Sequence, residues 1–127
     1  MNRDQIYQDI EKVAGLVPGF FQRLPDDALE HEWKLFKSAL EDEGPIPPKY
    51  RELAGLAVAS TLQCPYCIDA HTQFAKLFGA GDAEIEQAAR VGKHTAGWST
   101  YVAGLGTDLQ TFKDEIRRMC DHMRENL

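Results

Sequence analysis

Residues 47–71 read PPKYRELAGLAVASTLQCPYCIDAH, and this stretch decides how the chain folds. It opens on two prolines, which suit the first turn of a helix because proline lacks the N–H group that a helix start leaves unpaired. The residues that follow as far as Leu62 are mostly small and apolar, so neighbouring helices can approach this helix closely. Pro65 marks the start of a second helix, which the break from Gly79 to Gly81 ends. The stretch therefore predicts two consecutive helices, the first of them central to the fold.

Apolar residues recur at helical spacing on both sides of this stretch. No segment alternates apolar and polar residues with the period of two that is typical of a half-buried strand. We therefore predict an all-α fold, a helical bundle of about six or seven helices. Upstream, the expected helices cover 2–14 and, from a cap at Asp26 or Asp27, run to Leu40. Downstream, apolar residues recur at helical spacing from Asp82 to Gly106. Two glycines, at 92 and 97, leave open whether this segment is one continuous helix. A last helix is expected to start at Thr107 or Asp108.

The length of 127 residues suits one domain, because a chain of this size buries roughly two-thirds of its unfolded surface without metal or disulfide support. We predict a single domain over residues 1–127. Within it, residues 1–46 form an N-terminal helical segment, residues 47–105 a core that carries the motifs, and residues 106–127 a C-terminal helix. Apolar surface that remains on this unit is expected to close against copies of itself.

Charge and composition exclude several classes of function. The chain has 14 Lys and Arg residues against 20 Asp and Glu, a net charge of −6, so it lacks the basic surface that nucleic-acid binding needs. Its longest apolar stretch, Leu53 to Leu62, is too short to cross a bilayer. The N-terminus lacks the apolar run of a signal peptide, and three cysteines are a poor framework for a disulfide-stapled secreted domain. We therefore expect a cytoplasmic protein that binds neither nucleic acid nor membranes.

The motif Cys-x-x-Cys-x-x-x-His carries the chemistry. Cys64 comes just before the helix-starting Pro65, and Cys67 follows one turn later, so unpaired N–H groups and the helix dipole favour thiolate over thiol at this pair. Two thiols in adjoining turns also close into a disulfide with little change of the backbone. His71 follows Cys67 by four residues, and at about 100° per residue the three side chains share one helix face. An imidazole there accepts a proton from a thiol near neutral pH.

A carboxylate stands in the helix before the motif. Glu52 precedes Cys64 and lies in the middle of the predicted apolar helix. Burying an unpaired carboxylate is costly, so Glu52 needs a partner. His71 is the candidate partner.

The spacing of these residues resembles the alkylhydroperoxidase D-like branch of the carboxymuconolactone decarboxylase superfamily. The resemblance rests on the interval from Glu52 to Cys64 and on the Cys-x-x-Cys-x-x-x-His-Thr run that ends at Thr72. It extends to a Pro-Pro-Lys-x-Arg-Glu-Leu opening and a later Gly-Ala-Gly-Asp helix break. It covers residues 47–105, and the combined spacing is far more specific than Cys-x-x-Cys alone.

The resemblance implies a fold, an activity and a set of roles. The fold would be an all-α bundle that assembles into homotrimers or homohexamers. Glu52, Cys64, Cys67 and His71 would be the catalytic residues, with Glu52 and His71 forming a proton relay for the redox pair. The dithiol would reduce hydroperoxides or disulfides, as an antioxidant protein does. An external thiol reductant, such as a lipoyl group or thioredoxin, would regenerate it, with no bound cofactor or metal.

The resemblance also bears on the order of attack and on the substrate. In the relatives to which it points, the second cysteine attacks peroxide and the first resolves the intermediate, which assigns these steps to Cys67 and Cys64. The helix start instead favours Cys64 for attack on the disulfide of a partner. Tyr66 stands where the peroxidase prototype has histidine, which weakens the case for peroxidase chemistry and leaves disulfide reduction intact. Decarboxylases of the superfamily lack this cysteine pair, so lactone decarboxylation is disfavoured.

Two other interpretations of the cysteine pair need no catalysis. The cysteines form half of a zinc site if His71 and a further ligand such as His94 join them, although the sequence holds no second ligand pair. Buried free cysteines also pack as small hydrophobic residues. The alternative function is therefore a non-enzymatic redox-sensing or metal-binding assembly module on the same scaffold. Cys120 has no cysteine near it in the sequence and is expected at the edge of the core or at an interface.

Overall fold

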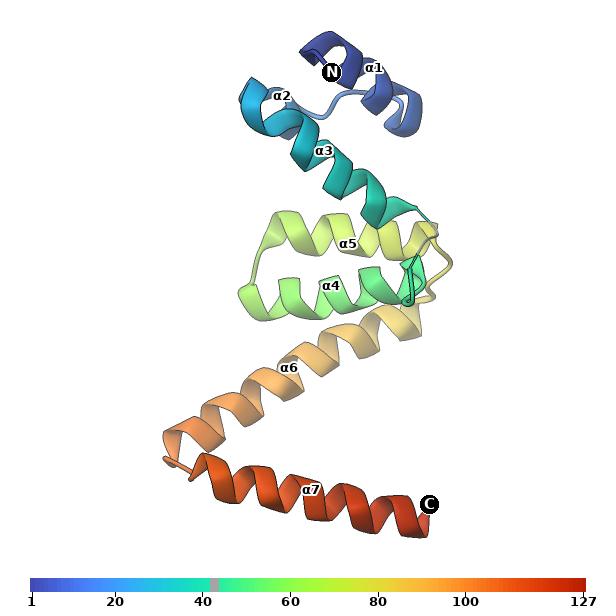
Figure 1. Ribbon diagram of the computed structural model, residues 1–127. Helices are drawn as coiled ribbons and strands as arrows, with labels where there is room; N and C mark the ends of the chain where they lie inside the picture. The colour runs from blue at the N-terminus through green and yellow to red at the C-terminus, as the bar shows by residue number, and fades with distance from the viewer. Residues whose placement is uncertain (42–43) are drawn as a thin grey trace.

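The computed structural model describes residues 1–41 and 44–127 (Figure 1). These residues form α-helices joined by short loops and contain no β-strand, which confirms the predicted all-α fold. The helices of the described residues are α1 (Arg3–Ala14), α2 (Gly19–Gln22), α3 (Asp26–Leu40), α4 (Pro48–Leu62), α5 (Pro65–Leu77), α6 (Asp82–Gly104) and α7 (Leu109–Asn126).

The three N-terminal helices pack around a small core of their own. Ile6 and Ile10 of α1, Phe21 of α2, and Leu29 and Trp33 of α3 form one cluster, and all five side chains are buried. Full burial of a large apolar side chain contributes about 1.5–3 kcal/mol, so this cluster explains why α1 packs against α3. The rings of Phe21 and Trp33 meet edge to face, with their centroids 5.5 Å apart.

A polar contact at the edge of this core orients Trp33. Its indole Nε1 donates a hydrogen bond to Oδ2 of Asp9 at 2.7 Å, and Nζ of Lys37 lies 3.0 Å from the same oxygen. The hydrogen bond from Trp33, and after it the one from Lys37, lowers the pKa of Asp9 below its usual value. The stability that this contact gives is therefore fully present above the pKa of an unfolded aspartate. It is lost as the pH falls through the lower pKa of the folded state.

The caps of α1 and α3 agree only in part with what the local sequence predicts. The side chain of Asn2 caps α1, and Gly15 ends it in the left-handed region with a φ of 82°. α3 begins at Asp26, but its N-cap residue is Pro25 and no side chain caps it, so the expected capping role of Asp26 or Asp27 is wrong. Both carboxylates lie in the first turn instead, where they face the positive end of the helix dipole.

The helix α4 lies at the centre of the fold, as its small residues predict. It packs against α5 and against α6, and α3 also contacts it. The helix α6 is continuous for 23 residues across Gly92 and Gly97, so neither glycine interrupts it. At Gly92 a Cβ atom would lie 2.7 Å from the carbonyl oxygen of Ala57, which means that this glycine lets α6 cross α4 at close range.

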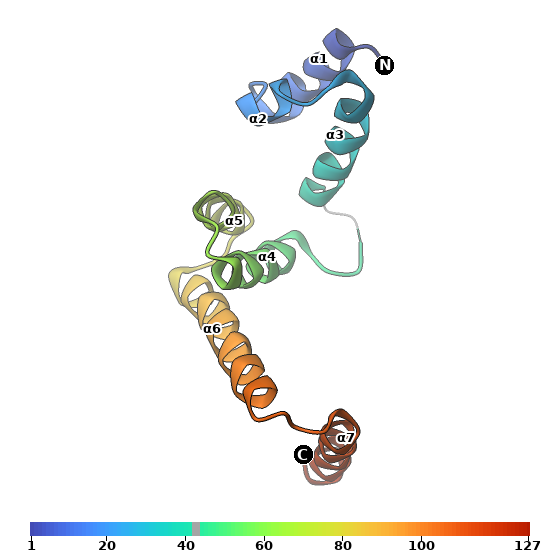
Figure 2. The same cartoon turned by 90° about the vertical axis from the view of Figure 1, so that its left-hand side faces the viewer.

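The helices follow one another along the molecule instead of closing around a single centre (Figures 1 and 2). The helices α1 to α3 lie at one end, α4 and α5 lie side by side in the middle, and α6 leads away from them to α7. No residue of α7 is buried, so its apolar side chains have no core of their own chain to join. None of the helices in the described ranges is long and apolar enough to span a membrane.

Candidate active site

The turn between α4 and α5 brings the motif to the start of a helix. The helix α4 ends at Leu62, and Gln63 follows in the left-handed backbone region with a φ of 54°. Cys64 then takes the N-cap position of α5 with an extended backbone, and Pro65 is the first helical residue. The chain thereby reverses its direction, and α5 returns alongside α4 (Figure 1).

Cys64 and Cys67 are joined by a disulfide, with their Cα atoms 5.3 Å apart. The Sγ atom of Cys64 also accepts a hydrogen bond from the backbone N–H of Cys67 at 3.2 Å. Because a helix start presents unpaired N–H groups, this contact favours negative charge on the Cys64 sulfur once the disulfide is reduced. Both cysteines are half-buried, so neither belongs to the buried core.

The N-cap position of Cys64 changes one step of the sequence-based reasoning. The helical angle of about 100° per residue applies to Cys67 and His71, which lie one turn apart within α5. It does not apply to Cys64, whose backbone is extended with a φ of −89° and a ψ of 105°. The disulfide and the capping hydrogen bond, not the helix repeat, hold Cys64 beside Cys67.

Glu52 and His71 form a pair between α4 and α5. Nδ1 of His71 lies 2.7 Å from Oε2 of Glu52. Glu52 is 6% exposed, and a carboxylate so deeply buried needs a hydrogen-bond partner. A neutral imidazole that donates from Nδ1 to this carboxylate has Nε2 as its acceptor, so Nε2 is the nitrogen that can take up a proton.

Gly55 lies against this pair, and from the sequence alone it has no predicted role in the site. Gly55 follows Glu52 by three residues on α4, so both lie on the face that meets α5. A Cβ atom at Gly55 would lie 2.5 Å from Cε1 of His71 and 2.7 Å from its Nδ1. The sequence feature that could have pointed to Gly55 is its position in the interior of a predicted helix, where glycine is unfavourable.

The other residues that the sequence singled out lie outside this cluster. Tyr66, between the cysteines, is 85% exposed. His94 accepts a hydrogen bond from Nε1 of Trp98 at 2.9 Å, and both residues belong to α6. Cys120 is a free, exposed thiol on α7. Across residues 1–41 and 44–127, no group of three or more His, Cys, Asp or Glu side chains is placed to hold a metal ion.

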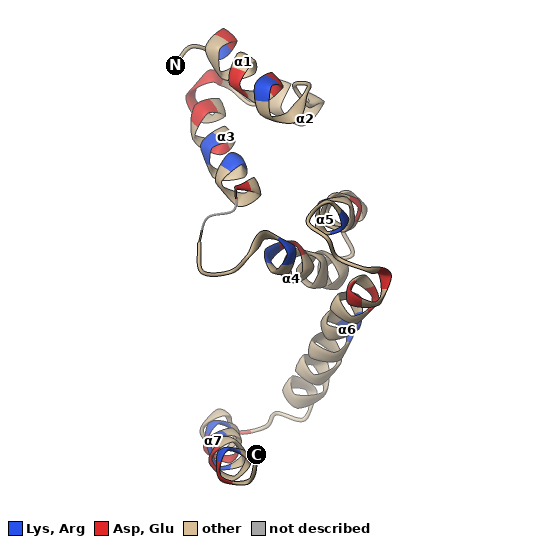
Figure 3. Ribbon diagram, turned by 90° about the vertical axis from the view of Figure 1, so that its right-hand side faces the viewer, with Lys and Arg blue, Asp and Glu red and all other residues tan. Residues whose placement is uncertain are grey.

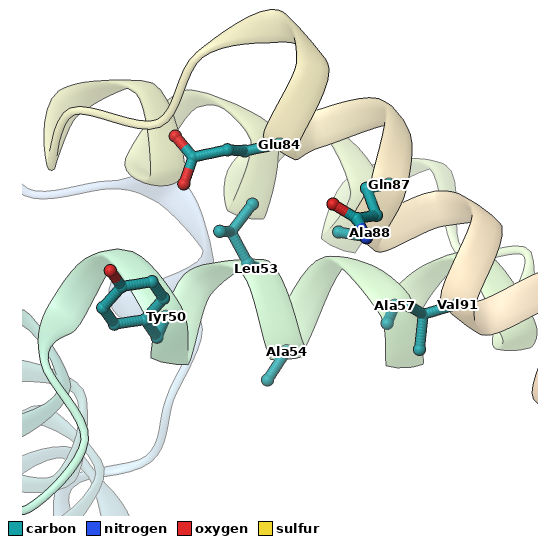
Figure 4. A pocket seen from close by; sticks show the side chains of 8 residues that line it. All are labelled: Tyr50, Leu53, Ala54, Ala57, Glu84, Gln87, Ala88 and Val91. Atoms are coloured by element: carbon teal, nitrogen blue, oxygen red, sulfur yellow. The ribbon is translucent and has the colours of Figure 1, made fainter. Parts of the chain in front are cut away.

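A groove of about 330 Å³ runs between α4 and α6 (Figure 4). Its lining is mainly apolar and includes Tyr50, Leu53 and Ala57 of α4, with Ala88 and Val91 of α6. None of the four predicted catalytic residues lines this groove. The groove is therefore separate from the cysteine pair and from the Glu52–His71 pair between α4 and α5.

The fold and these residues define an all-helical protein with a cysteine pair that forms a disulfide at the start of α5 and, one turn further along that helix, a histidine hydrogen-bonded to a buried carboxylate. The family model described as "Carboxymuconolactone decarboxylase family" matches residues 26–106. The chain therefore belongs to this family, as the motifs indicated. The match begins at the start of α3, so it includes a helix upstream of the region in which the motifs lie.

Two known proteins are similar to this chain. The chain is 30% identical to an alkyl hydroperoxide reductase of Mycobacterium tuberculosis; the match covers 81% of this chain and 31% of that protein. The chain thus spans about a third of that curated relative. The fold is similar to the crystal structure of the alkylhydroperoxidase AhpD core from Rhodospirillum rubrum, with a TM-score of 0.75, 24% identity, and coverage of 86% of this chain and 84% of that one.

Proposed function

We propose that the protein is a thiol-disulfide oxidoreductase of the alkylhydroperoxidase type, an antioxidant enzyme that reduces hydroperoxides or disulfides. The observation that carries the proposal is the Cys64–Cys67 disulfide at the start of α5, with His71, hydrogen-bonded to Glu52, one helical turn beyond Cys67. Within the family, a dithiol favours redox chemistry over decarboxylation. The name of the mycobacterial relative, an alkyl hydroperoxide reductase, supports the same choice.

In the proposed reaction with a hydroperoxide, the reduced pair supplies two electrons. Nε2 of His71 takes the proton of the attacking thiol, directly or through water, and the Glu52 carboxylate stabilises the imidazolium. The thiolate attacks one peroxide oxygen, the O–O bond breaks, and the leaving alkoxide takes back the proton as an alcohol. The sulfenic acid that remains is attacked by the second cysteine, which releases water and closes the disulfide.

A disulfide substrate would be reduced by the same pair. The attacking thiolate forms a mixed disulfide and releases one thiol, and the second cysteine then displaces the other thiol. The N–H of Cys67 that contacts Sγ of Cys64 supports Cys64 as the attacking thiolate on this route. Resemblance to the family assigns the attack on peroxide to Cys67 instead. The exposed Tyr66, in place of the histidine of the peroxidase prototype, favours the disulfide route.

A turnover panel tests the proposed function. The reduced protein is offered an organic hydroperoxide or a small disulfide, with dihydrolipoamide and reduced thioredoxin as competing thiol donors. We expect sustained turnover with at least one oxidant and one donor. Oxidation and reduction of the pair without turnover would favour the redox-sensing module, and stoichiometric zinc by elemental analysis would favour the metal-binding module.

We further propose that the working protein is a homotrimer or homohexamer. The accessible surface of the single chain is 9555 Å². A compact monomer of 14.3 kDa is expected to expose only about 6,800 Å². The excess, about 2,700 Å² on one chain, is well above the roughly 800 Å² that each partner contributes to an interface of standard size, as expected of large obligate interfaces. This surplus supports a chain that completes its fold against other copies.

The C-terminal helices contribute to this surplus. Residues 94–107 contain no Lys, Arg, Asp or Glu, and the second half of α6 is uncharged in Figure 3. On α7, five exposed apolar residues recur at alternating intervals of three and four, the spacing with which one helix packs lengthwise against another. We call them the α7 stripe, and they are Leu109, Phe112, Ile116, Met119 and Met123.

Ile116→Lys is expected to weaken the assembly, because it places a charge in the middle of the α7 stripe. Gln110→Lys introduces the same charge near the opposite face of α7 and is the matched control. Light scattering coupled to gel filtration should give a smaller mass for Ile116→Lys and an unchanged oligomer mass for Gln110→Lys. A strictly monomeric unaltered protein at micromolar concentration would contradict the assembly.

A further inference from the structure

The imidazole of His71 lies directly against the backbone of α4 at Gly55. A Cβ atom at Gly55 would be 2.5 Å from Cε1, 2.7 Å from Nδ1 and 2.9 Å from Nε2 of that ring. Non-bonded carbon atoms prefer separations of about 3.5–4.0 Å, so a methyl group and the ring cannot both occupy this space. The three atoms nearest to the missing side chain all belong to His71.

The ring is held in this space from two directions. Glu52 and Gly55 lie three residues apart on one face of α4, so the carboxylate and the space above the glycine are neighbours. The 2.7 Å hydrogen bond to Glu52 fixes the Nδ1 edge of the ring, while the backbone of α4 lies beneath it. A methyl group at Gly55 can be admitted only if the ring leaves Glu52 or if α5 moves away from α4. Either movement disturbs the hydrogen bond between His71 and Glu52.

Other helical glycines of the chain do not share this arrangement. Gly97 lies in the interior of α6, and no atom lies within 4 Å of a Cβ added there. At Gly92 the nearest atom is the backbone carbonyl oxygen of Ala57. Gly55 is thus a helical glycine whose missing side chain is replaced by the ring of a proposed catalytic residue. Since glycine weakens a helix interior, the contact with His71 gives a reason for its presence in α4.

We propose that Gly55 is a positioning residue: its lack of a side chain admits the His71 ring and keeps Nδ1 on Glu52, so that Nε2 is the nitrogen that exchanges protons. The catalytic part of this inference rests on the proposed function of the Glu52–His71 pair. The structural part, the dependence of the His71 hydrogen bond on Gly55, is independent of any activity.

The structural part is tested by nuclear magnetic resonance of protein with ¹⁵N-labelled histidine. The signals of the His71 ring are assigned from their loss in His71→Ala, and they report whether Nδ1 carries the proton. We expect Gly55→Ala to change this tautomer signal. Gly19→Ala makes the same substitution at the start of α2, where no atom lies within 4 Å of an added Cβ, and should leave the signal unchanged. An unchanged His71 signal in Gly55→Ala would overturn the proposal.

The catalytic part is tested by combining the two substitutions. General base catalysis contributes on the order of a hundredfold or more, and we expect Gly55→Ala to lose about the same factor in turnover as His71→Ala. The double variant should lose no more than His71→Ala and should fold as that variant does, because the ring that needs the space is gone. If the double variant loses more turnover than His71→Ala, or fails to fold, the methyl group at position 55 clashes with something other than the His71 ring, and the proposal is overturned. If the unaltered protein turns over neither oxidant, the proposed function fails, and the tautomer signal still decides the role of Gly55.

Discussion

Replacement of Cys67 by serine is expected to abolish turnover of hydroperoxides and of disulfides. The serine hydroxyl has nearly the size of the thiol, so α5 should form normally, but it cannot form a disulfide with Cys64. The catalytic cycle takes its two electrons from the closing of the Cys64–Cys67 disulfide. Without that disulfide, the rate should fall to that of the uncatalysed reaction. Steady-state turnover with dihydrolipoamide or thioredoxin as the donor measures the effect.

Two companion variants separate the roles of the cysteines. Cys120→Ser removes a free thiol on the exposed surface of α7, and this matched control should keep full turnover. Among Cys64→Ser and Cys67→Ser, the variant that still consumes one equivalent of oxidant retains the attacking cysteine. Full steady-state turnover by Cys67→Ser would contradict the hypothesis that Cys64 and Cys67 act as a redox pair.

Glu52→Gln is expected to lower turnover by about tenfold to a hundredfold, part of what general base catalysis contributes. Glutamine fills the same buried space and still offers an oxygen to Nδ1 of His71, which lies 2.7 Å from the carboxylate in the native protein. It carries no charge, however, and cannot stabilise the imidazolium that forms when His71 takes the proton of a thiol. The loss should therefore appear in the chemical step and not in the fold.

The matched control for this charge removal is Glu86→Gln. Glu86 is exposed on α6 and pairs with Arg90 four residues along the same helix, so its removal should change stability little. We expect normal turnover from this variant, and circular dichroism should show the same helix content for both. Equal turnover by Glu52→Gln and the unaltered protein would remove the carboxylate from the proposed relay.

The helical fold and the main parts of the candidate site could be predicted because their signals are local. Proline at a helix start and the four-residue step from Cys67 to His71 depend only on the geometry of one helix. The pairing of Glu52 with His71 is a contact between two helices. It could still be anticipated, because a carboxylate in an apolar helix needs a partner and few candidates were available.

The features that the sequence missed depend on how helices meet. Gly55 carries meaning only once the His71 ring is known to lie against it, and no local pattern contains that information. The continuity of α6 across Gly92 is explained by its close approach to the carbonyl of Ala57, because tertiary packing offsets the poor helix propensity of glycine there. The capping role expected of Asp26 fails for a local reason instead, since Pro25 occupies the N-cap position of α3 and Asp26 already lies in its first turn.

The most direct test of a redox-active pair is a thiol count by mass spectrometry after a single turnover. The fully reduced protein carries three cysteines, and each adds one label when an alkylating reagent is applied. After one equivalent of hydroperoxide or of a small disulfide, we expect one label to remain, on Cys120, with Cys64 and Cys67 protected as their disulfide. Retention of all three labels with both oxidants, or loss of the label from Cys120 alone, would contradict the proposed chemistry.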